Sequence, residues 1–353
     1  MLTYLSTEEV DGWVDVMERM PPASTTVVEK EQNDDDFVPE LRSIIEEADC
    51  DPGIIRKVMA GRSLPPTLAD AALIRSIVWP ALLGVSKRDV GEIEASSSEL
   101  LEKVFKQASI EPEAIPVAIL FCQSRGIELA EPIGAWVHLL KPIGALGASL
   151  SRQYTILHPI ATRMTPHTPV ALKAACDAIL LLLQYHEPRL SQRLSDLRLD
   201  VTKAFSPLLS SLFSSSNSPA IAALWDALFQ INDPILAVFL ITVLVINCGA
   251  DEGLSQLKTG DEFLALLTGS LDQIEEDDVG DFIDLAIQYR DLTPRTYLEE
   301  KISPLFSARP PTNSLAASLC IEVSPSESIL RWSFETYIII TNVTTVLHAI
   351  PPA

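Results

Sequence analysis

The residues best suited to acid–base or metal chemistry are five scattered histidines. No two of them have the HExxH spacing that places two imidazoles and a glutamate on one helical face to bind zinc. His186-Glu187 is the one adjacent histidine–glutamate pair, and because Pro188 follows it, we interpret it as a helix end rather than a ligand pair. The sequence also lacks the GxSxG turn that exposes a nucleophilic serine. The histidines are His138, His158, His167, His186 and His348.

The five cysteines are equally far apart, and none has the CxxC spacing. This pattern speaks against zinc sites and against a disulfide framework, so we predict reduced, mostly buried thiols in a cytoplasmic protein. Glycine-rich phosphate loops of the GxxxxGK[ST] and GxGxxG kinds do not occur either. We therefore predict that the chain uses no metal and no cofactor. The cysteines are Cys50, Cys122, Cys176, Cys248 and Cys320.

Acidic residues are concentrated in two blocks, and the whole chain has a formal net charge of −22. Residues 1–51 contain 15 acidic and 3 basic residues, and residues 251–291 contain 12 acidic and 2 basic ones. Such blocks are most often solvated faces of a fold. The alternative is a docking surface for a basic partner, because nucleic acid and anionic lipid are poor partners for so much negative charge.

The elements that must position all these residues are predicted to be helices. Aromatic residues make up only 6% of the chain and hydrophobic residues 47%, which favours helices packed on helices. Apolar residues recur at helical spacing, and proline, glycine and serine interrupt them. We therefore predict an all-α, multi-helical fold. The expected helices cover residues 54–59, 69–83, 100–107, 116–124, 136–140, 171–185, 205–213, 220–229, 235–248, 263–271 and 279–289.

The segment 235–248 is the most apolar, and it is the one stretch that imitates a membrane span. It is shorter than the ~20 residues that a helix needs to cross a bilayer, so we predict a buried core helix. Asp233-Pro234 is expected to open this helix, with the aspartate as cap and the proline at the first position. The acidic start of the chain lacks the basic region of a signal peptide.

Three regions are predicted along the chain. Residues 1–40 read as an acidic leader and linker, and residues 41–306 as one helical domain. The composition changes after Phe306, where residues 307–353 read as a linker and an irregular tail. The β-branched run at 338–340 would suit a strand, although no partner strand is close in sequence.

Several signature residues occur in a characteristic order. The first block, residues 61–85, is followed by residues 122–143, 181–190 and 223–246. Together these blocks resemble a TBC domain, the helical fold of GTPase-activating proteins for Rab GTPases. The resemblance is strongest to a branch in which a rhodanese-like domain follows, so residues 307–353 would include its incomplete start. The signature residues are Gly61, Arg62, Leu64, Pro65, Arg75, Trp79, Trp225, Asp226, Asp233 and Pro234.

The resemblance also implies where catalytic residues should stand. Active TBC domains supply an arginine from an IxxDxxR motif and a glutamine from a YxQ motif. Here Ala135 and Val137 occupy the tyrosine and glutamine positions, and no arginine lies between residues 89 and 124, which leaves Lys103 or Lys106 nearest. Lysine lacks the planar fork of arginine, and valine cannot hold a water molecule. If the two groups together contribute ~10⁴-fold, their loss removes about 5 kcal/mol of transition-state stabilisation.

The sequence therefore predicts a catalytically inactive TBC-like adaptor. By resemblance, it would act in vesicle tethering between endosomes and the trans-Golgi network, and bind golgin tips and a Rab GTPase there. It would reach membranes only through such partners, and it would bind no nucleic acid. We expect basic golgin segments to bind one of the acidic blocks. The alternatives are an active Rab GTPase-activating protein and a helical structural subunit that shares only the fold.

Overall fold

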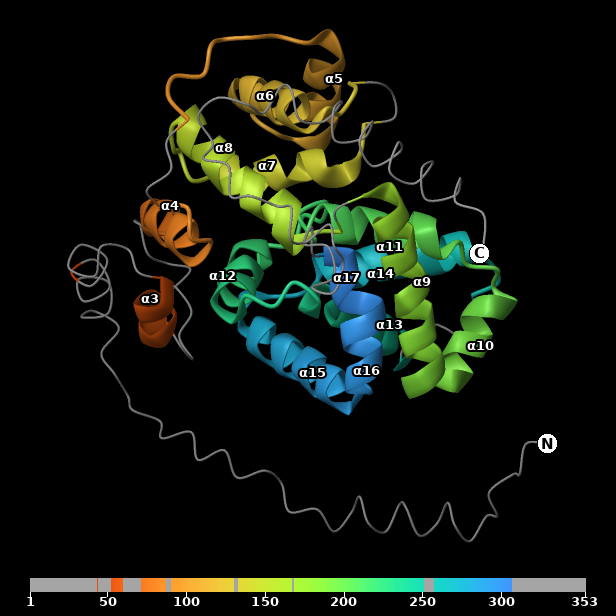
Figure 1. The fold of residues 1–353 in the computed structure, drawn as a ribbon. Coiled ribbons are helices and arrows are strands. Elements are labelled where there is room, and N and C mark those ends of the chain that lie inside the picture. Colours follow the sequence, from red (N-terminus) through yellow and green to blue (C-terminus); the bar gives the residue numbers. More distant parts are fainter. Residues whose placement is uncertain are drawn as a thin grey trace, which may run out of the picture. The chain divides into compact units, whose positions relative to one another are not determined.

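The protein is described from a computed structural model, which defines residue 43 and residues 52–59, 71–86, 90–129, 133–166, 168–250 and 257–306. The chain divides into two units, Met1–Glu40 and Leu41–Ala353, and all of these residues belong to the second. Every regular element among them is a helix, which confirms the predicted all-α class (Figure 1). The leader at 1–40, the tail at 307–353 and the strand predicted at 338–340 lie outside the described residues.

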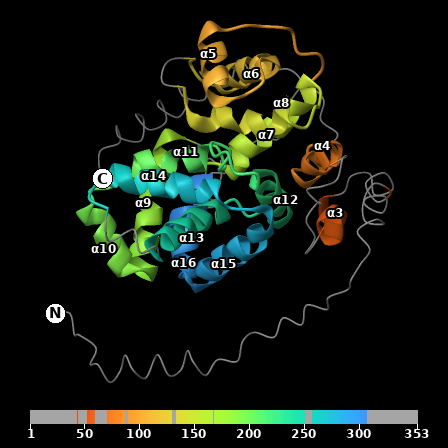
Figure 2. The ribbon, with the colours of Figure 1, turned by 180° about the vertical axis from the view of Figure 1, so that it is seen from behind.

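The helices form two neighbouring groups in this second unit. In the first group, α6 and α7 pack on α8, and in the second, α9, α11, α14 and α15 surround α13 (Figure 1). Helices α3 and α4 lie against α12, as Figure 2 also shows from behind. The main helices are α3 (Pro52–Met59), α4 (Ala71–Leu82), α5 (Glu99–Ala108), α6 (Ile115–Arg125), α7 (Leu140–Gly144), α8 (Leu150–Pro159), α9 (Pro169–His186), α10 (Pro188–Asp196), α11 (Val201–Ser210), α12 (Ile221–Ile231), α13 (Leu236–Ala250), α14 (Gly260–Asp272) and α15 (Val279–Leu292).

Shorter turns connect these helices. They are the 3-10 turns η1 (Pro112–Ala114), η2 (Ala135–Leu139) and η5 (Glu276–Asp278), the π-helical turns η3 (Ile160–Met164) and η6 (Leu298–Ile302), and the short helices α16 (Arg295–Tyr297) and α17 (Ser303–Phe306).

Helix α13 forms the centre of the core, as the apolar run predicted. All but one of the residues from Leu236 to Val245 are apolar, and all ten are buried; the exception, Thr242, donates its hydroxyl hydrogen to the carbonyl of Val238 at 2.9 Å. Neighbouring helices cover it on several sides, so it has no polar face. Among the described residues, no single helix is long and apolar enough to cross a bilayer, and the bent pair formed by 150–164 and α9 meets that test by length and composition only.

The start of α13 differs from the prediction. The helix begins at Leu236, two residues after Pro234, so the proline is not at the first helical position. Asp233 still accepts a hydrogen bond at 3.2 Å, from the backbone N–H of Ile235, and closes a turn before the helix. Its other oxygen pairs with Arg290, a role that local sequence does not reveal.

Two helices were missing from the prediction and one was divided. Helix α8 contains the buried polar residues Gln153 and Thr155, which weaken its apolar pattern. Helix α10 begins at Pro188, which we had interpreted only as the end of the preceding helix. A proline at the first helical turn loses no hydrogen bond, so one residue can end α9 and begin α10. The segment 136–140 forms the 3-10 turn η2 and the start of α7.

The serine-rich stretch between α11 and α12 is a compact turn. Leu212 and Phe213 are fully buried and both have positive φ, 47° and 68°, which costs a non-glycine residue energy. Side-chain hydrogen bonds hold the turn: Ser216 donates to Asp272 at 2.5 Å, and Ser218 donates to the carbonyl of Ile274 at 2.8 Å. The turn therefore fastens the α11–α12 connection to the end of α14.

Candidate functional site

Three signature residues that are far apart in sequence meet in a buried ionic cluster. The Nε and Nη2 atoms of Arg75 on α4 donate to Oδ2 of Asp226 on α12 at 2.9 and 2.8 Å. The indole N–H of Trp79, one helical turn after Arg75, donates to Oδ1 of the same carboxylate at 2.6 Å. Arg75 is 8% exposed and Asp226 only 2%, so water does not satisfy these groups.

Aromatic rings surround the buried cluster. The rings of Trp79 and Trp225 lie 5.4 Å apart, and Phe229 lies within 5.6 Å of both. Trp225 also donates its indole N–H to the carbonyl of Leu212 at 2.9 Å, in the serine-rich turn. Both tryptophans are fully buried.

The electrostatics of the cluster indicate a structural role. Burial raises the pKa of Asp226, whereas the hydrogen bonds from Arg75 and Trp79 oppose that rise because they stabilise the carboxylate. Arg75 and Asp226 are paired with each other and buried, and neither lines the groove or the polar hollow described below. A buried pair of this kind ties two helices together, and it becomes costly when one partner is removed.

Asp233 and Pro234, two further signature residues that the structure describes, lie outside the cluster. Asp233 pairs with Arg290 of α15 at 2.9 Å, in a half-buried bridge at another place in the fold. Pro234 is half-buried in the turn before α13. Gly61, Arg62, Leu64 and Pro65 lie outside the described residues.

Ala135 and Val137, the two positions that the resemblance assigns to catalysis, lie on η2 and differ in exposure. Val137 is 1% exposed, so its side chain belongs to the core. Ala135 is half-buried and lines a groove of about 580 Å³. The neighbouring Trp136 forms part of the same wall and packs on Phe121 of α6, with ring centroids 5.0 Å apart. Ala135 and Trp136 therefore reach the groove, whereas the side chain of Val137 does not.

The groove between α6, η2 and α9 is mainly apolar, with a few polar groups on its walls. Ile127, Leu172 and Pro166 line it, as do the hydroxyl-bearing Thr165 and Ser206. Arg125, the last residue of α6, is exposed and also lines it. The sequence places Arg125 in the block 122–143, directly after the interval 89–124 that lacks an arginine, and gives it no catalytic role. Lys103 is exposed on α5 and is not among the lining residues.

The cysteines of the described region are buried and unreactive. Burial raises the pKa of the Cys122 thiol to about 11 and that of Cys176 to about 12, so neither is a thiolate at neutral pH. Cys248 is also buried. These three confirm the predicted role of small hydrophobic residues, whereas Cys50 and Cys320 lie outside the described residues.

His186 ends α9, as predicted, and it belongs to a network of side chains rather than a ligand pair. Its Nε2 lies 2.9 Å from the hydroxyl of Thr293, and that hydroxyl donates its one hydrogen to the carbonyl of Tyr289 at 2.8 Å. Since the hydroxyl must then accept from the imidazole, neutral His186 carries its proton on Nε2. Burial lowers the pKa of His186, and burial together with Lys141 lowers that of His138.

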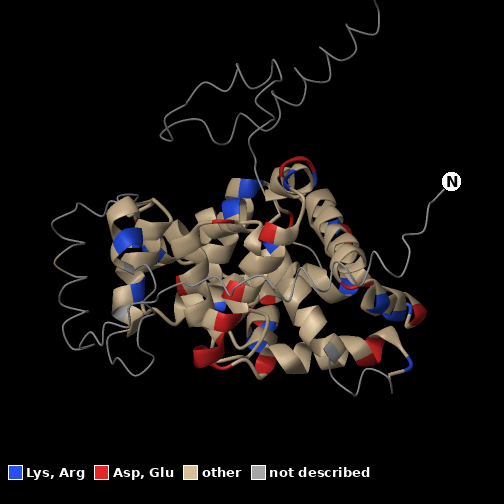
Figure 3. Ribbon diagram, turned by 90° about the horizontal axis from the view of Figure 1, so that it is seen from below, with Lys and Arg blue, Asp and Glu red and all other residues tan. Residues whose placement is uncertain are grey.

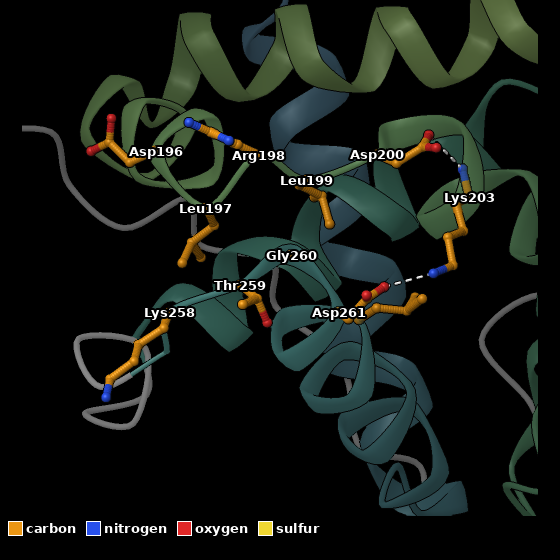
Figure 4. A pocket seen from close by; sticks show the side chains of 11 residues that line it. Asp196, Leu197, Arg198, Leu199, Asp200, Lys203, Lys258, Thr259, Gly260 and Asp261 are labelled. Atoms are coloured by element: carbon orange, nitrogen blue, oxygen red, sulfur yellow. Dashed lines mark hydrogen bonds and ion pairs between the residues drawn. The ribbon is translucent and has the colours of Figure 1, made fainter.

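A second hollow, of about 560 Å³, is polar and lies between the α10–α11 connection and the start of α14. Figure 4 shows Lys203 reaching towards Asp261, with which it forms an exposed ion pair at 2.6 Å. Three acidic and three basic side chains line the hollow, so it has no clear preference for a charged ligand. Gly260 allows the close packing here, because a Cβ atom would lie 2.9 Å from the Cα atom of Leu199.

Metal chemistry finds no support in the described ranges. No three His, Cys, Asp or Glu side chains there are grouped so that they could hold a metal ion. Comparison with known protein families adds no assignment, because no family model matches the sequence.

Proposed function

We propose that this chain is a catalytically inactive, TBC-like adaptor that binds protein partners. In this role the helical framework keeps a partner-binding groove but does not accelerate GTP hydrolysis. Rab GTPases hydrolyse GTP faster when a partner stabilises the charge on the γ-phosphate and orients the attacking water. An adaptor needs neither of these groups.

The observation that carries this proposal is the environment of Val137. Its aliphatic side chain is 1% exposed, at the position where the resemblance would expect a glutamine. A buried valine can neither orient water nor accept a proton, and Ala135 beside it has no functional group. The apolar walls of the groove favour binding of a protein surface over chemistry.

The proposed setting is vesicle tethering at the trans-Golgi network, with golgin tips as partners. This part of the proposal rests on the order of the sequence blocks and on the acidic character of the chain. Basic golgin segments would be attracted by the acidic region, and the cytoplasmic adaptor would be peripheral to the membrane.

Two measurements test the proposal. In a single-turnover assay over a panel of GTP-loaded Rab proteins, we expect the hydrolysis rate to stay at its intrinsic value when the chain is added. In a pull-down with immobilised N-terminal golgin segments, we expect retention that decreases as salt increases. A rate enhancement of 100-fold or more for any Rab would overturn the inactive assignment, and no retention at low salt would overturn the golgin assignment.

Arg125 supports a second candidate function, an active Rab GTPase-activating protein with an unusual arginine. It is exposed and lines the same groove as Ala135 and Trp136. An arginine in such a place could stabilise a developing phosphate charge. Under this alternative, the chain would accelerate hydrolysis and Arg125→Ala would abolish the acceleration, whereas Arg198→Ala, outside the groove, would not.

A further inference from the structure

Two charged side chains line the groove between α6, η2 and α9. Arg125 is the last residue of α6, Glu128 follows three positions later, and both are exposed. Neither forms an ion pair with any residue of the described ranges. Figure 3 shows long sections of the described ribbon without charged residues, and among the described residues that line the groove only these two are charged. A molecule bound there therefore meets one positive and one negative group, and neither is neutralised.

The apolar wall of the groove is built around Trp136. Its ring packs on Phe121 at a centroid distance of 5.0 Å, and it lies so close to Gly134 that a Cβ atom there would be 3.0 Å from the indole Cδ1. The indole N–H makes no hydrogen bond within the part of the chain that the structure describes. Ile127, which is 39% exposed, extends the wall. The aromatic ring is thus already in position for an occupant, and its hydrogen-bond donor is unused.

The chain itself contains a short segment with matching properties. Residues 331–335 read Arg-Trp-Ser-Phe-Glu and lie outside the described residues. Successive side chains of an extended segment point to opposite sides, so Trp332 and Phe334 would share one side and the two charged residues the other. Arg331 and Glu335 are also the only charged residues at neutral pH in the stretch 328–353. The segment therefore combines two aromatic groups with one base and one acid, which complements the groove.

The last described helix contacts elements that line the groove. Phe306 is buried at the end of α17, and α17 contacts η3 and α9. Ala161 of η3 and Leu172 of α9 both line the groove. Residues 307–330 supply 24 residues between Phe306 and the segment. An unfolded chain of that length spans roughly 25–30 Å on average and reaches about 80 Å when stretched, which is long enough to bring the segment to the groove.

We propose that residues 331–335 bind in the groove of the same chain and that a protein partner must displace them. Glu335 pairs with Arg125 and Arg331 with Glu128, while the two aromatic side chains pack on the apolar wall. The connection to α17 keeps the segment at an effective concentration in the millimolar range, so a second copy of the chain competes poorly for the groove.

The consequence is a groove that regulates its own access. A partner binds with an affinity reduced by the fraction of molecules in which the groove is open. This regulatory role rests on the proposed adaptor function, whereas the contact within the chain does not depend on it.

Photo-crosslinking in the full chain tests the contact directly. A photo-crosslinking residue replaces Ile127, at a low protein concentration where chains rarely meet, and mass spectrometry identifies the crosslinked peptides. We expect crosslinks to residues 331–335 within one chain, and about tenfold fewer in Trp332→Ser/Phe334→Ser. The same residue in place of Leu292, which is 64% exposed on α15, is the control and should give none of these crosslinks. Crosslinks between two chains, or to other segments alone, would overturn the proposal.

Charge reversal tests the pairing of Glu335 with Arg125. Arg125→Glu should lower the crosslink yield about tenfold, and Arg125→Glu/Glu335→Arg should restore it, because the pair can form again with its charges exchanged. Arg198→Glu is the matched control, since Arg198 lines the other hollow, and it should leave the yield unchanged. A yield that is insensitive to Arg125→Glu, or that the double reversal does not restore, contradicts the pairing.

The golgin pull-down separates this inference from the proposed function. Trp332→Ser/Phe334→Ser opens the groove and should raise the retention of golgin segments, and equal retention by the wild type would refute the regulatory role. If neither protein retains golgin segments although the crosslinks form, the contact stands and the golgin assignment is wrong. If golgin segments are retained but the crosslinks do not form, the adaptor function stands and the contact is wrong.

Discussion

The buried cluster around Asp226 and the groove around Ala135 make opposite use of polar chemistry. In the cluster, an arginine and an aspartate are fully paired and closed to solvent. In the groove, Ala135 stands at one of the two positions that the resemblance assigns to catalysis, and the other, Val137, is buried in the core beside it. The charged residues of the signature thus hold two helices together, whereas the walls of the groove are mainly apolar.

Three of the signature residues have a structural role. Arg75, Trp79 and Asp226 belong to the pattern that suggested a GTPase-activating fold. In the structure, however, their hydrogen bonds connect α4 to α12. Such residues indicate how the helices pack and do not indicate activity. Activity must be judged from the groups that reach the groove, which include Ala135, Trp136 and Arg125.

Removing one partner of the buried Arg75–Asp226 ion pair should have the largest effect on stability. We expect Asp226→Ala to lower the free energy of unfolding by about 3 to 5 kcal/mol, because Arg75 would remain buried without its partner. Urea titration followed by circular dichroism measures the loss. Arg75→Met/Asp226→Leu should recover much of it, and Arg295→Ala, at an exposed pair, should change little. A near-neutral Asp226→Ala would show that the cluster is not structural.

Trp79 and Trp225 allow a comparison of a charged and a neutral hydrogen-bond acceptor in the core. Trp79→Phe removes a hydrogen bond to a buried carboxylate, so we expect a loss of about 2 kcal/mol. Trp225→Phe removes one to a neutral backbone carbonyl and should cost about 1 kcal/mol. Both variants lose the same atoms, so the difference between their urea midpoints isolates the contribution of the charge. If Trp225→Phe cost more, the carboxylate would not be the dominant acceptor.

The groove is tested by restoring the missing groups. Val137→Gln should leave the rate of Rab GTP hydrolysis unchanged and lower the free energy of unfolding by about 1 to 3 kcal/mol, because it buries an amide in the core. Ala135→Gln, at the half-buried neighbour, is the control and should be tolerated better. Accelerated hydrolysis by Val137→Gln would mean that the position reaches a bound GTPase.

The smallest expected effect is a pH dependence from the partly buried histidines. Burial lowers the pKa of His186 and of His138 below the ordinary 6.5, so below pH 6.5 the unfolded chain binds protons that the folded chain resists. Stability should therefore fall as the pH drops from about 6.5 towards 5.5, and stay level above 6.5. Urea midpoints at pH 7.5 and 5.5 measure this, and His186→Asn should reduce the difference. A rise in stability on acidification would contradict it.

Much of the helical framework could be predicted from apolar spacing. The predicted segments at 171–185 and 279–289 correspond to α9 and α15, because long apolar faces at helical period are strong signals. The apolar length of 235–248 also identified a buried helix. Helix α8 was missed because it buries two polar residues, each of which donates one hydrogen bond nearby: Gln153 donates to the carbonyl of Ala148, and Thr155 donates to that of Ser151.

The sites were less predictable, since they depend on contacts across the fold. Arg75 and Asp226 are 151 positions apart, and nothing in either local segment reveals the other. The pairing of Asp233 with Arg290 and the meeting of Tyr185 with Tyr289 around His186 are of the same kind. Arg125 is visible in the sequence directly after Ser124, but its place in the groove depends on how α6 packs beside η2 and α9.

The turn from Ser211 to Ser218 has the composition of a flexible spacer, but it is mostly buried and held by side-chain hydrogen bonds. Its two left-handed residues, Leu212 and Phe213, carry their strain inside the core, and the carbonyl of Leu212 receives the Trp225 indole. Replacing this turn by a glycine–serine stretch of equal length would keep the connection between α11 and α12. It would remove the buried side chains of Leu212 and Phe213 from the core around Trp225. Low-complexity filters that discard such stretches would therefore remove part of the interior of this protein.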